Sequence, residues 1–330
     1  MRLSIIRMVI IGLAVSTSLS AVEKKNVSFK NGDIALSGTL YLPKGEGPFP
    51  ALVFVHGSGP ETRKNSSYSA KWLSSIGYAA LIYDKRGTGK SQGEENEWNR
   101  FSFENLANDV VAAVNFLTGE EKIDSDKIGL HASSQGGWVA PLAASKTNLI
   151  SFMVIRSASV TSVGDDRIFE RSARLKKEGF SDSEIAEASE MQRAEAKTSS
   201  EKEDTFSQLF ETSKAKAWFP RVYGGNSPFS EFLVGYRKWY ATIVDFDPFP
   251  LLKSLEIPVF WIFGDPQLDS KGPVEQSINN VDSLKKSGKV YTIVQFDGVG
   301  HNIPEKLYER TLYDWLNQVN RYTGFKFRKH

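Results

Sequence analysis

The sequence contains no cysteine among its 330 residues. This absence excludes disulfide bonds, a lipid-bearing N-terminal cysteine, thiolate metal ligands and a cysteine nucleophile. Histidine is scarce as well, because only four are present and they are scattered along the chain. Without a cluster of metal-ligating side chains, we expect neither a metal ion nor another cofactor. Any nucleophile in this protein must therefore be an oxygen atom.

The sequence also has no excess of positive or negative charge. The chain has 41 basic and 39 acidic residues, and residues 1–20 contain Arg2 and Arg7 but no acid, so the remainder has 39 of each. A net charge of zero gives no steering toward nucleic acid, and we expect no nucleic-acid partner. A hydrophobic content of 40% over this length can form one large domain, or a core domain that carries an insertion.

Residues 1–20 have the features of a secretory signal peptide. Arg2 and Arg7 precede the apolar run Met8–Val15. The small residues Ser18 and Ser20 follow it, and we expect cleavage directly before Ala21. A membrane anchor is the competing interpretation, but the apolar run is too short to span a bilayer comfortably. The sequence therefore predicts an exported protein, periplasmic or secreted, without a stable membrane span after cleavage.

Short apolar runs alternate with helix-length amphipathic segments over most of the chain. Two segments of alternating polarity, 26–30 and 34–42, flank a turn at Asn31–Asp33 and predict a β-hairpin. Continuously apolar runs indicate strands covered on both faces, and these are 51–55, 78–83, 127–130, 152–155, 259–263 and 290–296. Helical periodicity is found at 67–76, 103–117, 137–145, 274–286 and 305–322. This alternation predicts an α/β fold with a mostly parallel central sheet flanked by helices.

The stretch "GLHASSQGGW" (129–138) places two serines before two glycines, directly after an apolar run. A nucleophilic serine on a sharp strand-to-helix turn needs small residues two positions before and two positions after it, because larger side chains would collide across the turn. Ser134 has Ala132 and Gly136 at these positions, whereas the equivalent neighbours of Ser133 are larger. The pattern favours Ser134 as a nucleophile over a Ser/Gly-rich turn that merely caps a helix.

A serine hydroxyl needs a base to take its proton and a third group to orient that base. His131 lies on the strand before the turn and is expected to pack there, His330 ends a basic tail, and His56 lies in a Gly-rich loop. Elimination leaves His301, in a glycine-rich turn after the last predicted strand. It follows Ser134 in the chain order serine, acid, histidine, which favours a base over a structural turn histidine.

The acid is expected in the loop after the predicted strand 259–263. Asp265 stands near the start of this loop, before Pro266, and fits a plain turn residue. Asp269 stands four positions before Pro273, which opens the next predicted helix. This spacing favours Asp269 as the acid, and Asp265 stays the alternative.

Acyl-transfer chemistry also needs hydrogen-bond donors aimed at the oxyanion of the tetrahedral intermediate, each contributing roughly 3–4 kcal/mol. Gln135 follows the candidate nucleophile and supplies a backbone N–H at a helix N-terminus. Ser58, in the stretch "HGSG" (56–59), can supply the second N–H. The competing interpretation of that stretch is a flexible turn.

The region 163–250 interrupts the alternation of strands and helices. It begins with a charged helical stretch and is too long for a simple connection between strands. We predict a helical cap insertion over the strand ends, on a core formed by 21–162 and 251–330. Its second half is rich in aromatic residues, which are Trp218, Phe219, Tyr236, Trp239 and Tyr240. We expect this half to cover Ser134 and to form the wall of a substrate pocket. For each single residue the alternative is that it packs the helices of the insertion onto the core.

Together these motifs resemble those of the α/β-hydrolases, and the chain is similar to the bacterial esterases grouped with the serine aminopeptidase-like branch. The resemblance covers nearly the whole chain after residue 20. It is carried by "LSGTLYLP" (36–43), "FPALVFVHGSGP" (49–60) with Arg63, "YDKRGTGKS" (83–91), "SSQGGWVAPLAA" (133–144), the Asp269-x-x-x-Pro273 loop and "GVGH" (298–301).

The resemblance implies that Ser134 is the nucleophile, His301 the base and Asp269 the residue that orients it. It also implies an oxyanion hole formed by the N–H groups of Ser58 and Gln135. A structural role follows for the loop after the strand 78–83, which braces the site in this family through Asp84, Arg86, Gly87, Gly89 and Ser91. The chain departs from the family at Ala132, where glycine is usual, and in an acid loop that is about two residues longer.

The predicted function is that of an exported, metal-independent serine hydrolase that cleaves carboxylic esters through an acyl-enzyme intermediate. The expected partner is accordingly a small-molecule ester. An exopeptidase or amidase that acts on small peptides is the alternative, because the same triad serves amides. A non-catalytic binding protein that has kept the fold is the third interpretation.

Overall fold

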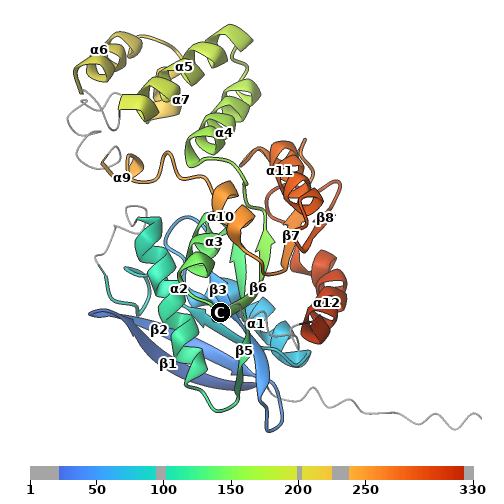
Figure 1. The fold of residues 1–330 in the computed structure, drawn as a ribbon. Helices are drawn as coiled ribbons and strands as arrows, with labels where there is room; N and C mark the ends of the chain where they lie inside the picture. Colours follow the sequence, from blue (N-terminus) through green and yellow to red (C-terminus); the bar gives the residue numbers. More distant parts are fainter. Residues whose placement is uncertain (1–21, 94–101, 199–202, 225–237, 323–330) are drawn as a thin grey trace, which may run out of the picture.

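The computed structural model describes residues 22–93, 102–198, 203–224 and 238–322 (Figure 1). The predicted signal peptide at 1–20 lies outside these ranges and stays a prediction. Within the described ranges, no helix combines the length and the apolarity needed to cross a membrane.

An eight-stranded sheet forms the centre of the described structure, in the order β1-β2-β4-β3-β5-β6-β7-β8. β1 and β2 form an antiparallel hairpin, β2 is antiparallel to β4, and the other neighbours are parallel. Because parallel strands end at the same edge, the loops after β3, β4, β5, β7 and β8 gather there. The strands are β1 (Glu23–Asn31), β2 (Ile34–Leu42), β3 (Phe49–Val55), β4 (Ala79–Tyr83), β5 (Ile123–Ser133), β6 (Ile150–Arg156), β7 (Val259–Phe263) and β8 (Tyr291–Gln295).

Helices cover both faces of the sheet because successive residues of the central strands point in opposite directions. On β3, Ala51 and Val53 belong to a buried cluster shared with α2, α3, α10 and α11, whereas Leu52 and Phe54 belong to a second cluster shared with α1 and α12. These helices are α1 (Ser67–Ser75), α2 (Phe103–Thr118), α3 (Gly136–Lys146), α10 (Phe249–Ser254), α11 (Val274–Lys286) and α12 (Glu305–Tyr322). The predicted α/β fold is confirmed (Figure 1).

The largest difference between a predicted and an observed strand is at β5. The apolar run predicts residues 127–130, but the strand begins at Ile123 and ends at Ser133. Its first half is largely solvent-exposed and polar, from Asp124 to Lys127, so apolar content cannot reveal it. It joins the sheet through its pairing with Phe49 at the start of β3.

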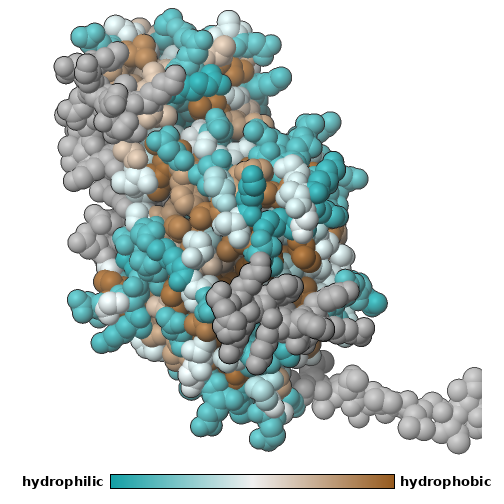
Figure 2. Space-filling model, viewed as in Figure 1, coloured by the Kyte–Doolittle hydropathy of each residue, from teal (hydrophilic) through white to brown (hydrophobic). Residues whose placement is uncertain are grey.

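Between β6 and β7 the chain forms α4 (Val163–Lys177), α5 (Asp182–Thr198), α6 (Glu203–Ser213) and α7 (Phe219–Tyr223). Figure 1 shows these four helices as a group beyond one edge of the sheet, and Figure 2 shows that their visible outer surface is mostly hydrophilic. They bury a cluster of their own: Leu175, Ala188, Met191, Phe206, Phe210, Trp218, Phe219, Val222 and Tyr223. The insertion is therefore helical with a separate core, while its boundaries at 163 and 250 stay predictions.

The described aromatic residues of the insertion divide between two buried clusters. Trp218 and Phe219 are 1% and 0% exposed inside the insertion's own cluster. Trp239 and Tyr240, on α9 (Lys238–Tyr240), are buried in the main cluster with α2 and α3. The prediction of a pocket wall is wrong for Trp218 and Phe219, because helices that lie away from the sheet need a core of their own. For Trp239 and Tyr240, which pack against the core helices, it stays a prediction. Tyr236 lies outside the described residues.

Candidate active site

The turn between β5 and α3 holds Ser134 in an unusual backbone conformation. Its φ of 50° lies in the left-handed region, which residues other than glycine rarely adopt. Ser134 N–H donates to Arg156 O at 3.0 Å, and Gly137 N–H donates to Ser134 O at 2.8 Å. Ala132 is fully buried, so the methyl group in place of the family's usual glycine is accommodated. The turn has the backbone shape that presents a serine side chain at the edge of a sheet.

Three side chains from distant parts of the sequence meet at this turn. His301 Nε2 lies 3.1 Å from Ser134 Oγ, and His301 Nδ1 lies 3.2 Å from both carboxylate oxygens of Asp269. The Asp269 side chain is 2% exposed, whereas that of His301 keeps 25% exposure. This arrangement allows Nε2 to take the proton of the hydroxyl while Nδ1–H donates to the carboxylate.

Asp265 has different neighbours from Asp269. Its carboxylate accepts hydrogen bonds from the N–H groups of Gln267 at 2.9 Å and Gly298 at 3.1 Å. The second bond joins the loop after β7 to the loop after β8. Asp265 therefore braces these two loops, and Asp269 is the acid that contacts His301.

The other two described histidines are held by partners of their own. His56 Nε2 lies 2.7 Å from the carbonyl oxygen of Tyr83, and burial lowers the pKa of His56 to about 4. The ring of His131 stacks on Phe54 with the ring centroids 4.7 Å apart, and burial lowers the pKa of His131 to about 3. Both rings are neutral at neutral pH. His330 lies outside the described residues.

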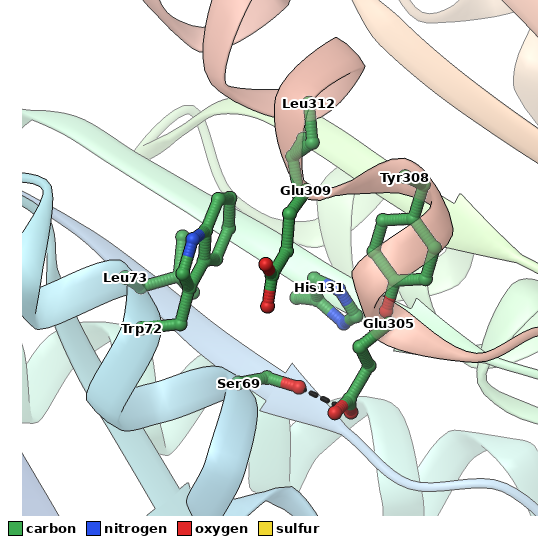
Figure 3. Close-up of a pocket in the computed structure, with 8 residues that line it drawn as sticks. All are labelled: Ser69, Trp72, Leu73, His131, Glu305, Tyr308, Glu309 and Leu312. Atoms are coloured by element: carbon green, nitrogen blue, oxygen red, sulfur yellow. Dashed lines mark hydrogen bonds between the residues drawn. The ribbon is translucent and has the colours of Figure 1, made fainter.

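Ser133 has different surroundings from Ser134. It shares a face of β5 with His131 and lines a cavity of about 120 Å³, together with residues that include His56, Glu61, Arg156 and Glu305. A smaller cavity adjoins it between α1 and α12, where Ser69 donates a hydrogen bond to Glu305 (Figure 3). The two adjacent serines of the motif therefore face different parts of the molecule.

The two predicted oxyanion donors lie beside Ser134. Gln135 directly follows it and precedes the first residue of α3, and a Cβ placed on Gly57 would lie 3.5 Å from Ser134 Cβ. Among the residues that the structure describes, neither Ser58 N–H nor Gln135 N–H donates to another protein group. Unpaired N–H groups beside a hydroxyl are suited to an oxygen that gains negative charge.

Two ion pairs hold the loop after β4. Arg63 binds Asp84 with Nε 3.0 Å from Oδ1 and Nη2 2.8 Å from Oδ2. Burial alone would raise the pKa of Asp84, but hydrogen bonds from Arg63 outweigh it and lower this pKa. Arg86 binds Asp109 of α2 in the same two-pronged way, with distances of 2.6 Å and 2.5 Å. The positions of both pairs fit a bracing role for this loop.

The sequence did not single out two buried charged residues near the site. Asp166, in the first turn of α4, accepts a hydrogen bond from Ser159, and burial raises the pKa of Asp166 to about 7. Lys85, directly after Asp84, is 1% exposed. Charged residues are ordinarily exposed, so their residue types gave no indication of burial. Within the described ranges, no group of three His, Asp or Glu residues is placed to hold a metal ion.

The fold defines the class of protein to which the chain belongs. The mostly parallel sheet with helices on both faces is that of the α/β-hydrolases. An esterase of Pyrococcus furiosus, Pf2001, matches with a TM-score of 0.56 at 17% identity, and 91% of each chain is covered. An acylaminoacyl peptidase of Pyrococcus horikoshii matches with a TM-score of 0.55 at 20% identity, over 95% of this chain and 43% of that chain. These likenesses concern the fold.

The family follows from the sequence comparison. The family model for X-Pro dipeptidyl-peptidase (S15 family) matches residues 31–286, and the chain belongs to this family. It is also similar to the esterase EstD of Thermotoga maritima, with 28% identity over 251 residues, or 72% of this chain and 52% of the relative. The chain spans about half the length of the curated relatives it matches. The predicted resemblance to α/β-hydrolases is confirmed, and the chain is a member of a hydrolase family.

Proposed function

We propose that this protein is a serine hydrolase that cleaves carboxylic esters of small molecules. Ser134 Oγ attacks the ester carbonyl while His301 Nε2 takes its proton, and Asp269 stabilises the resulting imidazolium. The N–H groups of Ser58 and Gln135 donate to the oxyanion. His301 then gives the proton to the departing alcohol, and water releases the acyl group from Ser134 by the same steps in reverse order.

The observation that carries this proposal is the 3.1 Å distance between His301 Nε2 and Ser134 Oγ, on a turn that gives Ser134 its left-handed backbone. A binding protein that had only kept the fold would have no reason to maintain this geometry. The similarity to EstD, which is named an esterase, favours an ester as the bond cleaved.

The acids of α4 that lie near the acid loop already have partners. Asp166 accepts a hydrogen bond from Ser159, and Glu170 lies 2.6 Å from the ammonium of Lys271. A peptidase that acts from the amino terminus of its substrate can bind the free amine through an unpaired carboxylate. These two residues are engaged with other groups and do not supply one.

A peptidase is the second candidate function, because the matching family model is named for X-Pro dipeptidyl-peptidases. The same three side chains would cleave an amide bond by the same steps. The two functions therefore differ in how the substrate is bound and not in the groups that react.

We further propose that the protein is exported, since residues 1–20 have the composition of a signal peptide. N-terminal sequencing of the protein from the periplasmic fraction and the medium of producing cells tests this proposal. Ala21 as the first residue supports export, and an intact Met1 on protein confined to the cytoplasm contradicts it.

The function is tested with p-nitrophenyl esters of increasing acyl length beside aminoacyl and Xaa-Pro p-nitroanilides. We expect kcat/KM to be highest for the short-chain esters and low for the anilides. Ser134→Ala should lower ester turnover by about 10⁵-fold or more, whereas the matched Ser133→Ala should retain most of it. A fluorophosphonate probe should label every protein that retains Ser134.

Faster cleavage of Xaa-Pro anilides than of esters would replace the first candidate function by the second. Equal probe labelling of the Ser134→Ala protein and of the unmodified protein would contradict the assignment of the nucleophile in both.

A further inference from the structure

Lys85 is a buried cation beside the candidate oxyanion hole. It lies two residues after β4 and is 1% exposed. Its Nζ donates one hydrogen bond to Gly57 O at 2.8 Å and another to Gln135 Oε1 at 2.8 Å. In the described part of the chain, its ammonium makes no ion pair. A buried charge without an ion pair destabilises a fold, so stability alone does not explain this residue.

The bond to Gly57 fixes one of the two proposed oxyanion donors. Gly57 C=O and Ser58 N–H belong to the same peptide unit, which is planar and trans, so the two groups point in opposite directions. An ammonium on the carbonyl oxygen therefore holds the N–H on the other side of the plane. It also withdraws electrons from the amide, which strengthens the N–H as a donor.

The bond to Gln135 restrains the residue that carries the second donor. The backbone N–H of Gln135 is the other proposed oxyanion ligand, and its side chain is 5% exposed with its oxygen held by Lys85. One cation thus joins the loop after β3 to the first residues of α3, the two segments that carry the hole.

Glu61 holds the preceding peptide unit, which carries the N–H of Gly57. The Glu61 carboxylate accepts a hydrogen bond from the Gly57 backbone, and a Cβ on Gly57 would lie 2.9 Å from Glu61 Oε1. A side chain at position 57 would therefore displace this clamp, which explains the glycine. The two peptide units that meet at Gly57 are therefore each held by a side chain, the one with Ser58 N–H by Lys85 and the one before it by Glu61.

We propose that Lys85 is a positioning residue that orients and polarises both backbone donors of the oxyanion hole. The proposal rests on the proposed function, because it assumes that an oxyanion forms next to Ser134. It assigns Lys85 an effect on the transition state and none on the binding of the ground-state ester.

The charge of Lys85 is also placed to change near neutral pH. Burial lowers the pKa of Lys85 to about 8, against the opposing effect of Glu61 after β3 and Asp109 on α2. His56, which also faces Lys85, is neutral because its own pKa is about 4. Asp84 and Arg86, its chain neighbours, are paired with Arg63 and Asp109. The ammonium is thus charged below about pH 8 and neutral above it.

Lys85→Met tests the proposal, because methionine is unbranched, retains most of the length of the side chain and removes its donor. We expect kcat for a short-chain p-nitrophenyl ester to fall about 10- to 100-fold with KM changed less than about threefold. A trifluoromethyl ketone, which forms an oxyanion on Ser134, should lose affinity by a similar factor. Lys90→Met, at an exposed lysine of the same loop, is the matched control and should leave kcat unchanged.

If Lys85 had a purely structural role, Lys85→Met would lower the fraction of protein with a titratable active site but not the turnover of each site. Fluorophosphonate titration therefore normalises every kcat. Turnover per site within about twofold of the unmodified protein, or unchanged affinity for the ketone, would overturn the proposal.

Gln135→Leu is the second variant in case Lys85→Met does not fold. It keeps the backbone N–H and the Gly57 bond and removes only the side-chain acceptor, so kcat should fall about 3- to 10-fold with KM unchanged. The unmodified protein should also lose kcat above about pH 8, and Lys85→Met should lack this decrease. A decrease of equal size in both proteins would contradict the role of the ammonium.

Failure of this inference is distinguishable from failure of the proposed function. If Ser134→Ala abolishes turnover while Lys85→Met does not change it, the function stands and the role of Lys85 is wrong. If Ser134→Ala retains turnover, the proposed function itself is wrong.

Discussion

At the level of single residues, the two acids of the loop after β7 can be separated by matched substitutions. Asp269→Asn retains the side-chain volume but removes the charge that faces His301 Nδ1, so we expect kcat for esters to fall about 10⁴-fold. Asp265→Asn retains an oxygen that can accept from the N–H groups of Gln267 and Gly298, so kcat should stay within about tenfold. Steady-state kinetics on a short-chain ester measure both.

Circular dichroism and thermal unfolding of both variants serve as the control, because a triad lesion should leave the fold intact. An inactive, folded Asp265→Asn beside an active Asp269→Asn would reverse the assignment of the acid.

At the level of elements, the approach of α3 to β3 depends on Gly136. A Cβ there would lie 2.7 Å from Val55 O and 3.0 Å from His56 O, both rigid backbone atoms. Gly136→Ala must push the helix away from the strand, and we expect a loss of about 1–3 kcal/mol in the free energy of unfolding. Because Ser134 and Gln135 immediately precede this contact, kcat should fall at least about tenfold as well.

Gly119→Ala is the matched control for this prediction. Gly119 ends α2 with a φ of −90°, and a Cβ there would meet only Phe116 O at 3.6 Å. Its unfolding free energy should change by less than about 0.5 kcal/mol, measured by urea denaturation. Similar losses in the two variants would mean that the close approach of α3 is not the cause.

At the level of the whole molecule, the pair between Arg63 and Asp84 connects the loops after β3 and β4, and Arg63 Nη1 also donates to Gly38 O on β2 at 2.6 Å. Arg63→Met leaves a buried carboxylate without its partner, and we expect a loss of about 3–5 kcal/mol at pH 7. Lys64→Met, at the exposed neighbouring residue, should change stability by less than about 0.5 kcal/mol.

The pair between Arg63 and Asp84 also predicts that the free energy of unfolding depends on pH. The pKa of Asp84 is lowered in the folded protein from a value of 3.8, so its contribution is fully present above pH 3.8 and is lost as pH falls through the folded pKa. Without Arg63 the burial of Asp84 favours its protonated form, so the stability difference between the unmodified protein and Arg63→Met should shrink steadily as urea unfolding is repeated from pH 7 down through pH 3.8. A difference that is constant with pH would show that the charge of Asp84 does not stabilise the fold.

The separate core of α4–α7 predicts that this group of helices can loosen without the sheet. Phe219 is fully buried there and packs on Phe210 with ring centroids 4.8 Å apart. Phe219→Ala should lower local stability by about 3–5 kcal/mol and accelerate hydrogen exchange in α4–α7. Exchange in β3–β8 should be unchanged, and so should the acyl-length preference. Accelerated exchange in both regions would mean that the insertion and the sheet unfold together.

The sequence by itself determined most elements of the core and the position of the sharp turn that carries Ser134. The helices at 274–286 and 305–322 have the bounds that their periodicity predicts, because that pattern records which face of a helix is buried. The small residues around Ser134 are a local requirement of the turn, and they indicated which of the two adjacent serines occupies it. Such features depend on neighbours within a few positions along the chain.

The tertiary structure alone decided which distant side chains meet. Ser134 and His301 are 167 positions apart, and whether Asp265 or Asp269 reaches His301 depends on how two loops pack at the edge of the sheet. The burial of Lys85 and the packing of Trp218 in the insertion's own core could not be predicted for the same reason. The sequence shows the chemical properties of each side chain, but the neighbours of that side chain come from elements that only folding brings together.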